Sequence, residues 1–488
     1  MRSDYSHTGW RLIDGKWAYL TSTGAVGLEG VRVRLGQNLS RYQLPLLPQN
    51  VREAMQASVR FWEVADYDIS IPLWSAMYLA PLASLVPLFF TIWLFGTTGS
   101  LKSTLTALAF SHFGKFAFNT PPASWTATQN ALEKLAFVLK DSPLWIDDFT
   151  SQSTVSGQQD LLRKADTLLR DWGNGAGRTR MRSDLTLRQT FVPRGLIIST
   201  AEQLPPIESI NSRLFQIESG PGRVTRGEGS NLTLAQQNDA PLYPHAMAGY
   251  TLWVSDHLPE LEKSLPALQL ELTERARSEG GSHLRLPANI ATLYIGFKMG
   301  VLYARHVGAM SEEDATAMLE LGWNVLMGLG SRQQEVSVEE KPVEMYFNAL
   351  EQMFAQGITY LRHKDAPEDD ARAWPSAAVR TANCEFLGWF DDRYWYLLPR
   401  VAFNAVYRFY KTTGTVFPDT ERGIRVKLLE SKLLFPNKDR FTCRLRIGAD
   451  SIARVLRVLR PGIEVDPSSF ESGSSGTTGT AGTEEEEN

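Results

Sequence analysis

The sequence predicts an α/β fold in which helices flank a parallel sheet. Three apolar runs support this prediction: residues 87–95, 144–149 and 194–200. Apolar runs of this kind are typical of strands that are buried on both faces of a sheet. Residues 126–139 and 158–172 show helical periodicity, and strands that alternate with helices indicate parallel pairing.

A glycine-rich turn joins the first of these strands to a helix that begins at Thr104. The turn reads Gly96, Thr97, Thr98, Gly99, Ser100, Leu101, Lys102 and Ser103. Strand, glycine-rich turn, Lys-Ser and helix form the context of a phosphate-binding loop, whose backbone N–H groups attract an anion. In this interpretation residues 96–104 hold ATP, Lys102 reaches its β- and γ-phosphates, and Ser103 holds Mg²⁺. The alternative is an ordinary turn, since Leu101 replaces the glycine that usually precedes the lysine.

The second strand, residues 144–149, ends in two carboxylates, Asp147 and Asp148. The carboxyl ends of the strands are where open α/β sheets bind ligands. Asp147 suits Mg²⁺ coordination, and Asp148 suits orienting and deprotonating an attacking water. A pair of helix-capping acids is the alternative. The third strand ends in hydroxyls, and Thr200 is expected either to sense the γ-phosphate or simply to end the strand.

Two groups of arginines follow the acidic strand. Arg178, Arg180 and Arg182 recur with period two after a glycine-rich turn and share one face of a predicted hairpin, and Arg188 lies on its return. Such a face pairs with DNA phosphates without reading bases, or it forms ion pairs between subunits. Arg213 stands just ahead of a fifth predicted strand.

One long segment without charge raises the question of a membrane span. No charged residue occurs between Ile69 and Leu101, and this length is sufficient to cross a bilayer. Pro72, Pro81 and Pro87 break the segment, and a buried helix followed by a central strand produces the same composition. We therefore expect no membrane association.

The overall composition is that of a globular chain of several domains. Of its 488 residues 43% are hydrophobic and 21% charged, which is enough to bury a sizeable core. The net charge of −4 gives no global signature of nucleic-acid binding. Only two cysteines occur, so a disulfide framework is excluded and a cytoplasmic location is expected. No signal peptide is expected at the start of the sequence.

The predicted organisation has a β-rich region at 1–48, the α/β core at 49–222, a helical region at 223–340, a basic module at 341–466 and a disordered acidic tail at 467–488. Asp14-Gly15 predicts a hairpin near the start. Asn50 and Glu53 predict a capping box for a helix that extends to Tyr67.

The C-terminal half contains helices, linkers and one strongly basic segment. We expect helices at 287–306, 311–327 and 345–363, and linkers at 220–238 and 332–340.

Residues 393–460 hold 15 Lys and Arg against 5 Asp and Glu, an excess of ten positive charges. Helices at 399–410 and 420–434 followed by a strand at 441–447 form the pattern of a winged helix that binds DNA, or a basic solvated surface.

In this order the motifs resemble those of AAA+ P-loop ATPases. Gly99–Ser103, Ile146–Phe149 and Ser212–Leu214 are similar to the phosphate loop, acidic motif and arginine finger of minichromosome-maintenance-type helicases, although that family has Glu at Asp148. Residues 9–19, 122–125 and 173–178 resemble a narrower group, a domain-of-unknown-function family of helicase-like proteins of bacterial phages and mobile elements.

The resemblance implies a helical lid after the core and a ring of subunits, a homo-hexamer in which Arg213 reaches a neighbour's nucleotide. It implies an ATP-driven ring motor on single- or double-stranded DNA, most simply the replicative helicase of a mobile element. The alternative is an ATP-dependent initiator or switch that binds DNA without translocating. A small-molecule kinase uses the same loop, but the arginine finger and the basic module argue against it.

Overall fold

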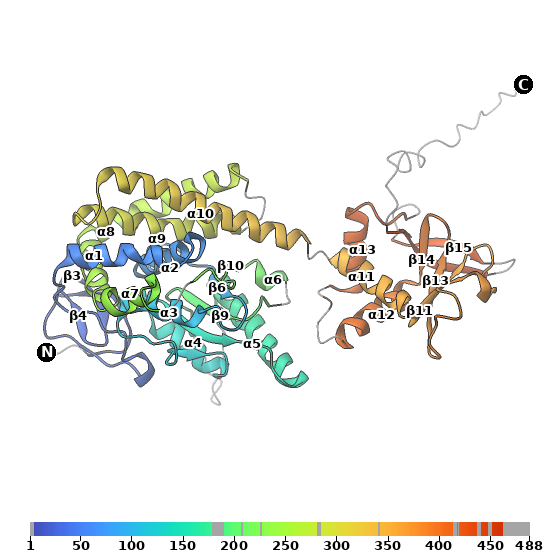
Figure 1. The fold of residues 1–488 in the computed structure, drawn as a ribbon, viewed down its shortest axis with the longest axis horizontal. Coiled ribbons are helices and arrows are strands. Elements are labelled where there is room, and N and C mark those ends of the chain that lie inside the picture. Colours follow the sequence, from blue (N-terminus) through green and yellow to red (C-terminus); the bar gives the residue numbers. More distant parts are fainter. Residues whose placement is uncertain are drawn as a thin grey trace, which may run out of the picture. The chain divides into compact units, whose positions relative to one another are not determined.

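The computed structural model describes residues 4–177, 190–205, 208–224, 227–280, 285–339, 342–412, 417, 419–436, 441–447 and 451–461. The chain divides between residues 338 and 339 into two compact units (Figure 1).

The first unit is built on a five-stranded sheet in the order β10-β6-β9-β8-β7. The strands are β6 (Thr91–Phe95), β7 (Ala123–Ser124), β8 (Leu144–Phe149), β9 (Ile197–Ala201) and β10 (Leu214–Glu218). Every pairing in this sheet is parallel. The predicted α/β fold with a parallel sheet is therefore confirmed. The strands predicted to start at residues 87 and 194 begin later, at Thr91 and Ile197.

Helices cover the sheet on both sides and bury its apolar strands. They are α1 (Val51–Arg60), α2 (Tyr67–Leu79), α3 (Lys102–Phe110), α4 (Gln129–Val138), α5 (Val155–Gly173), α8 (Tyr243–Ser278), α9 (Leu286–His306) and α10 (Glu312–Glu339). Figure 1 shows α8, α9 and α10 gathered on one side of the sheet. Helix α2 is buried from Ile69 to Leu79, which confirms the buried helix expected in the uncharged segment. Within the described ranges, no helix is both long enough and apolar enough to cross a membrane.

Four local predictions in this unit are wrong. Helix α10 continues to Glu339, across the described part of the linker expected at 332–340. The loop expected at 220–238 contains α7 (Asn231–Leu234) and a π-helical turn, Ala235–Asp239. Asn50 precedes α1 but has a φ of 44° and no side-chain capping bond. This helix ends at Arg60, because a 3₁₀ turn follows it before α2.

Short strands open the first unit. Strands β2 (Gly9–Ile13) and β3 (Lys16–Thr21) form the hairpin predicted around Asp14-Gly15, and β4 (Gly24–Val26) pairs with β3. Strands β1 (Asp4–Tyr5) and β5 (Arg32–Val33) form a separate parallel pair. Trp10, Tyr19 and Val26 belong to the same hydrophobic core as the five-stranded sheet, so the β-rich region packs directly on it.

The second unit has a six-stranded sheet in the order β12-β11-β13-β14-β16-β15. Its elements are α11 (Pro342–Ala355), β11 (Thr359–His363), β12 (Ala373–Trp374), β13 (Glu385–Phe390), β14 (Tyr394–Leu397), α12 (Pro399–Thr412), α13 (Glu421–Glu430), β15 (Cys443–Ile447) and β16 (Ser451–Leu459). The helix predicted to reach His363 stops at Ala355, because Gly357 has a φ of 65° and starts a strand. Helices α12 and α13 and strand β15 lie where two helices and a strand were predicted, but the six-stranded sheet was not predicted.

Candidate nucleotide-binding site

The glycine-rich turn connects strand β6, which lies between β10 and β9, to helix α3. Gly96 has a φ of 154°, and a Cβ atom there would lie 2.0 Å from the carbonyl oxygen of Ser219. Only glycine fits this close approach of two backbones. Ser219 also donates its hydroxyl to the Ser100 carbonyl at 2.9 Å, which ties the loop to the end of β10.

Lys102 is the first residue of α3, and its ammonium group lies inside the loop. Nζ donates to the carbonyl oxygens of Gly96 at 2.7 Å and Thr97 at 2.9 Å, and to the Ser100 hydroxyl at 3.2 Å. Burial lowers the pKa of Lys102, whereas the carboxylates of Glu202 and Asp147 raise it. The loop thus presents one cation at the helix N-terminus, where the helix dipole also favours an anion.

Leu101 occupies the position where phosphate loops usually have glycine. Its φ of 61° and ψ of 19° place it in the left-handed region, which costs a non-glycine residue about 1–2 kcal/mol. The loop therefore keeps the backbone conformation that glycine would adopt freely. Only the side chain at position 101 differs from the usual pattern.

Asp147 near the end of β8 meets the helix and the neighbouring strand. Its Oδ1 accepts a hydrogen bond from Ser103 Oγ at 2.9 Å and another from the hydroxyl of Thr200. The Trp145 indole donates to Thr200 Oγ1 at 3.3 Å, which fixes that hydroxyl from behind. The structure thus brings three predicted site residues together from α3, β8 and β9.

Asp148 reaches the same cavity because the strand is irregular. Successive side chains of a regular strand point to opposite faces, but Asp148 has a φ of 67° and the β8–β9 register shifts between Ile146 and Phe149. Burial raises the pKa of the Asp148 carboxyl, and the charges of Asp147 and Glu202 raise it further. The bulge therefore places two consecutive acids at one site.

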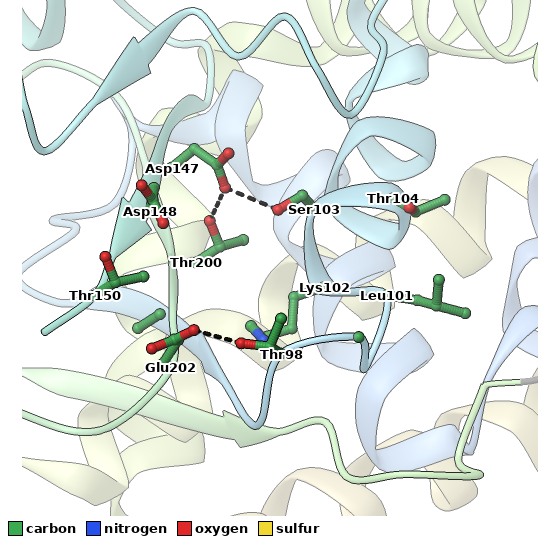
Figure 2. Close-up of a pocket in the computed structure, with 12 residues that line it drawn as sticks. Thr98, Leu101, Lys102, Ser103, Thr104, Asp147, Asp148, Thr150, Thr200 and Glu202 are labelled. Carbon is green, nitrogen blue, oxygen red and sulfur yellow. Dashed lines mark hydrogen bonds between the residues drawn. The ribbon is translucent and has the colours of Figure 1, made fainter.

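These residues surround an open cavity of about 270 Å³ at the carboxyl edge of the sheet. Its lining consists of Thr98, Gly99, Leu101, Lys102, Ser103, Thr104, Asp147, Asp148, Thr150, Thr200, Ala201 and Glu202. Figure 2 shows Asp148, Thr150 and Glu202 along one wall, across from Ser103 and Thr104. The sequence interpretation missed Thr150 and Glu202. Their only sequence signal is that each is polar and closely follows a strand.

Arg213 lies elsewhere. It precedes β10, whereas the phosphate loop follows β6, and in a parallel sheet these positions are at opposite edges. Its Nη2 donates to Asn174 Oδ1 at 3.4 Å, and Arg285 donates to the same oxygen at 3.2 Å. Burial lowers the pKa of Arg213, and the nearby charges of Arg285 and Arg170 lower it further. Arg178, Arg180, Arg182 and Arg188 lie outside the described residues.

Comparison with known proteins finds one family model and one solved structure of the same fold. A family model described as Domain of unknown function (DUF927) matches residues 73–190, which include the loop and the acidic strand. No curated protein matches the chain. A solved structure described as "SCCmec type IV Cch - active helicase" aligns with a TM-score of 0.58 at 14% identity, covering 94% of this chain and 79% of that one. This chain therefore shares the fold of that protein over 94% of its own length.

Two further solved structures match more loosely. One is the JCV helicase, with a TM-score of 0.26, 14% identity, and coverage of 51% of this chain and 66% of that chain. The other is the NrS-1 C-terminal region, with a TM-score of 0.27, 12% identity, and coverage of 62% and 76%. Neither similarity is high enough to carry an argument.

Proposed function

We propose that this chain is a Mg²⁺-dependent ATPase that works as a ring-shaped motor on DNA, the replicative helicase of a mobile genetic element. The observation that carries the proposal is the convergence of Lys102, Ser103, Asp147 and Thr200 on one cavity at the carboxyl edge of the sheet. This set of groups, at this place in a parallel sheet, suits phosphoryl transfer to water.

The donor set fits a nucleotide and its metal. Ser103 and Asp147 offer a hydroxyl and a carboxylate 2.9 Å apart, and Mg²⁺ prefers such oxygen ligands together with water and phosphate. Mg²⁺ would neutralise phosphate charge when bound. Lys102 would exchange its loop carbonyls for the β- and γ-phosphates, and Thr200 would contact the γ-phosphate.

The sheet and the position of Arg213 favour a ring. Numbered along the chain, the strands are ordered 5-1-4-3-2, in keeping with the AAA+ resemblance of the motifs. Arg213 stands at the edge opposite the phosphate loop, so head-to-tail packing would bring it to the neighbouring subunit's nucleotide. Heterologous contacts of this kind close into rings when the rotation permits. The fold shared with a protein described as an active helicase agrees with this assignment.

DNA contacts are proposed on both units. In the second unit, Arg444 and Arg454 are exposed and directly opposite each other on β15 and β16. Like charges in this arrangement destabilise a hairpin, and a phosphate between them relieves the repulsion. We assign duplex binding with little sequence preference to this module, and channel contacts to Arg178, Arg180, Arg182 and Arg188.

The alternative function is an ATP-dependent initiator or switch that does not translocate. Asp148 favours it, because its side chain is one methylene shorter than the family's Glu and a small displacement of a catalytic group costs about 100-fold in rate.

Steady-state ATP hydrolysis by the full chain, with and without single-stranded DNA, tests the proposal. We expect Mg²⁺-dependent turnover that DNA stimulates, unwinding of a forked duplex, and a loss of orders of magnitude in Lys102→Ala, which removes charge stabilisation of the transferred phosphoryl group. The matched control is Lys16→Ala, which replaces an exposed lysine of the N-terminal hairpin. Unchanged turnover in Lys102→Ala contradicts the site, and turnover without unwinding favours the switch.

A further inference from the structure

Glu202 is an acidic residue of the cavity that has no role in the function proposed above. It follows β9 directly, and its Oε1 accepts a hydrogen bond from the Thr98 hydroxyl at 2.5 Å. Thr98 belongs to the phosphate loop, so this bond joins the loop to the neighbouring strand across the cavity. Figure 2 shows Glu202 on the wall that also carries Asp148, with its hydrogen bond running to Thr98 beside Lys102.

The backbone on both sides of Glu202 is fixed. Its N–H donates to the Phe149 carbonyl at 3.1 Å, and the next carbonyl, that of Gln203, accepts the Trp93 indole N–H at 3.1 Å. The side chain is exposed to the cavity, but its base is held by β8 and β6 together. Such anchoring keeps a catalytic group within the small positional tolerance that chemistry requires.

Glu202 is better placed than Asp148 to meet a γ-phosphate. The Glu202 carboxylate is bonded to the phosphate loop itself, whereas the Asp148 side chain bonds to Thr150, which follows its own strand. The charge of Glu202 acts on both Lys102 and Asp148, since it raises the pKa of each group. Glu202 also supplies the methylene that Asp148 lacks relative to glutamate.

We propose that Glu202 is a catalytic residue of this cavity, whose carboxylate orients and deprotonates the water that attacks ATP; the inference rests on the proposed ATPase function. The water oxygen bonds to the γ-phosphorus. The bond from that phosphorus to the β–γ bridging oxygen breaks, and its electron pair leaves with ADP. One water proton passes to the Glu202 carboxylate and from there to solvent.

The test is steady-state kinetics of Glu202→Gln in the full chain, beside Asp148→Asn and the control Gln203→Ala. Glutamine keeps an oxygen that accepts the Thr98 hydroxyl, so the hydrogen bond persists while the ability to take a proton is lost. We expect kcat to fall by about 100-fold or more, the usual range for a general base. KM for ATP and the Kd for ATPγS should not rise, because the substitution removes a negative charge that faces phosphate.

The outcomes separate clearly. A larger kcat loss in Glu202→Gln than in Asp148→Asn, with Gln203→Ala at the wild-type rate, supports Glu202 as the base. A kcat for Glu202→Gln within about threefold of wild type, well short of a base's contribution, overturns the inference and leaves the ATPase assignment standing. A larger loss in Asp148→Asn returns the role to that residue and also overturns it. If the wild type binds ATPγS but shows no turnover, the proposed function itself fails.

Discussion

The two ends of the acidic strand show how one residue type serves two purposes. Asp141 lies three residues before β8, at the N-terminal edge of the sheet, and Asp147 lies near the carboxyl end of the same strand. Both carboxylates accept hydrogen bonds inside the first unit. They differ in how many carboxylate oxygens remain available to bind a further partner.

Asp141 is completely buried and fully engaged. Its Oδ2 accepts the Trp10 N–H at 3.0 Å and the Lys140 ammonium at 2.5 Å, and its Oδ1 accepts the Ser84 hydroxyl at 2.5 Å. The Tyr19 hydroxyl donates to its backbone carbonyl. Three separate segments therefore meet at this residue, which fastens the N-terminal β-hairpin to the sheet.

Asp147 uses only one of its oxygens in the described contacts. Ser103 and Thr200 both donate to Oδ1, and the residue lines the open cavity. A buried carboxylate that accepts hydrogen bonds on both oxygens holds the fold together, whereas a carboxylate with one oxygen left over at a cavity has the capacity to bind a metal ion. The two carboxylates also differ in burial, since Asp141 is completely buried and Asp147 is half-buried at the cavity.

The largest expected effect is on stability, at Asp141. Asp141→Ala leaves the Lys140 ammonium and the Trp10 N–H without their buried acceptor, and breaking a buried pair in this way costs about 3–5 kcal/mol. Urea unfolding followed by tryptophan fluorescence measures the loss. Asp160→Ala, which breaks an exposed pair with Arg163, should change the free energy of unfolding by less than about 1 kcal/mol. Equal effects of the two variants contradict the structural role of Asp141.

The second effect is on catalysis, at Asp147. Asp147→Asn keeps the size of the side chain and an oxygen for Ser103 and Thr200, but it removes the charge that would hold Mg²⁺. We expect ATP turnover to fall by about 10²–10³, the range for losing one electrostatic contact to a transition state. The urea midpoint should stay near that of the wild type. If Asp147→Asn instead unfolds at lower urea concentration but retains its turnover, Asp147 stabilises the fold and does not serve catalysis, which contradicts this prediction.

The sequence predicts the cavity end of β8, with Asp147, much better than the buried end, with Asp141. Local rules predicted that the loop, Asp147 and Thr200 would lie close together, because parallel strands bring their carboxyl ends to one edge. The Thr98–Glu202 contact joins residues 104 positions apart, and nothing local distinguishes Glu202 from a solvated turn residue. Asp141 was missed for the same reason, since its partners Trp10 and Ser84 come from distant segments.

The second unit illustrates a different limit. A single left-handed glycine, Gly357, turned an expected helix end into strand β11, and the sheet that this strand joins has contacts too distant for a periodicity argument. Polar composition also misled in the linker expected at 332–340, because α10 continues to Glu339. Tertiary context decides such segments, so their local pattern is a weak guide.

The smallest expected effect concerns His112, a buried group that resembles Asp141 in being fully engaged. Its Nε2 lies 2.8 Å from Ser58 Oγ and its Nδ1 lies 2.7 Å from the Ala109 carbonyl. The carbonyl can only accept, so Nδ1 carries the proton and Nε2 accepts from the hydroxyl. Ser58 Oγ also accepts the Trp74 indole N–H at 2.9 Å and lies 2.8 Å from the Tyr78 hydroxyl, so His112 belongs to a buried hydrogen-bond network.

Burial lowers the pKa of His112 to about 4, below the value of 6.5 that it has when exposed. The unfolded chain therefore binds a proton at a pH where the folded chain does not, and the stability present above pH 6.5 is lost as the pH falls toward 4. Between pH 7 and 5.5 this linkage lowers the free energy of unfolding by about 1 kcal/mol. Urea unfolding of wild type and His112→Gln at both pH values isolates the contribution. The wild type should lose about 1 kcal/mol more than the variant, and equal losses in both would show that His112 is free to charge in the folded state.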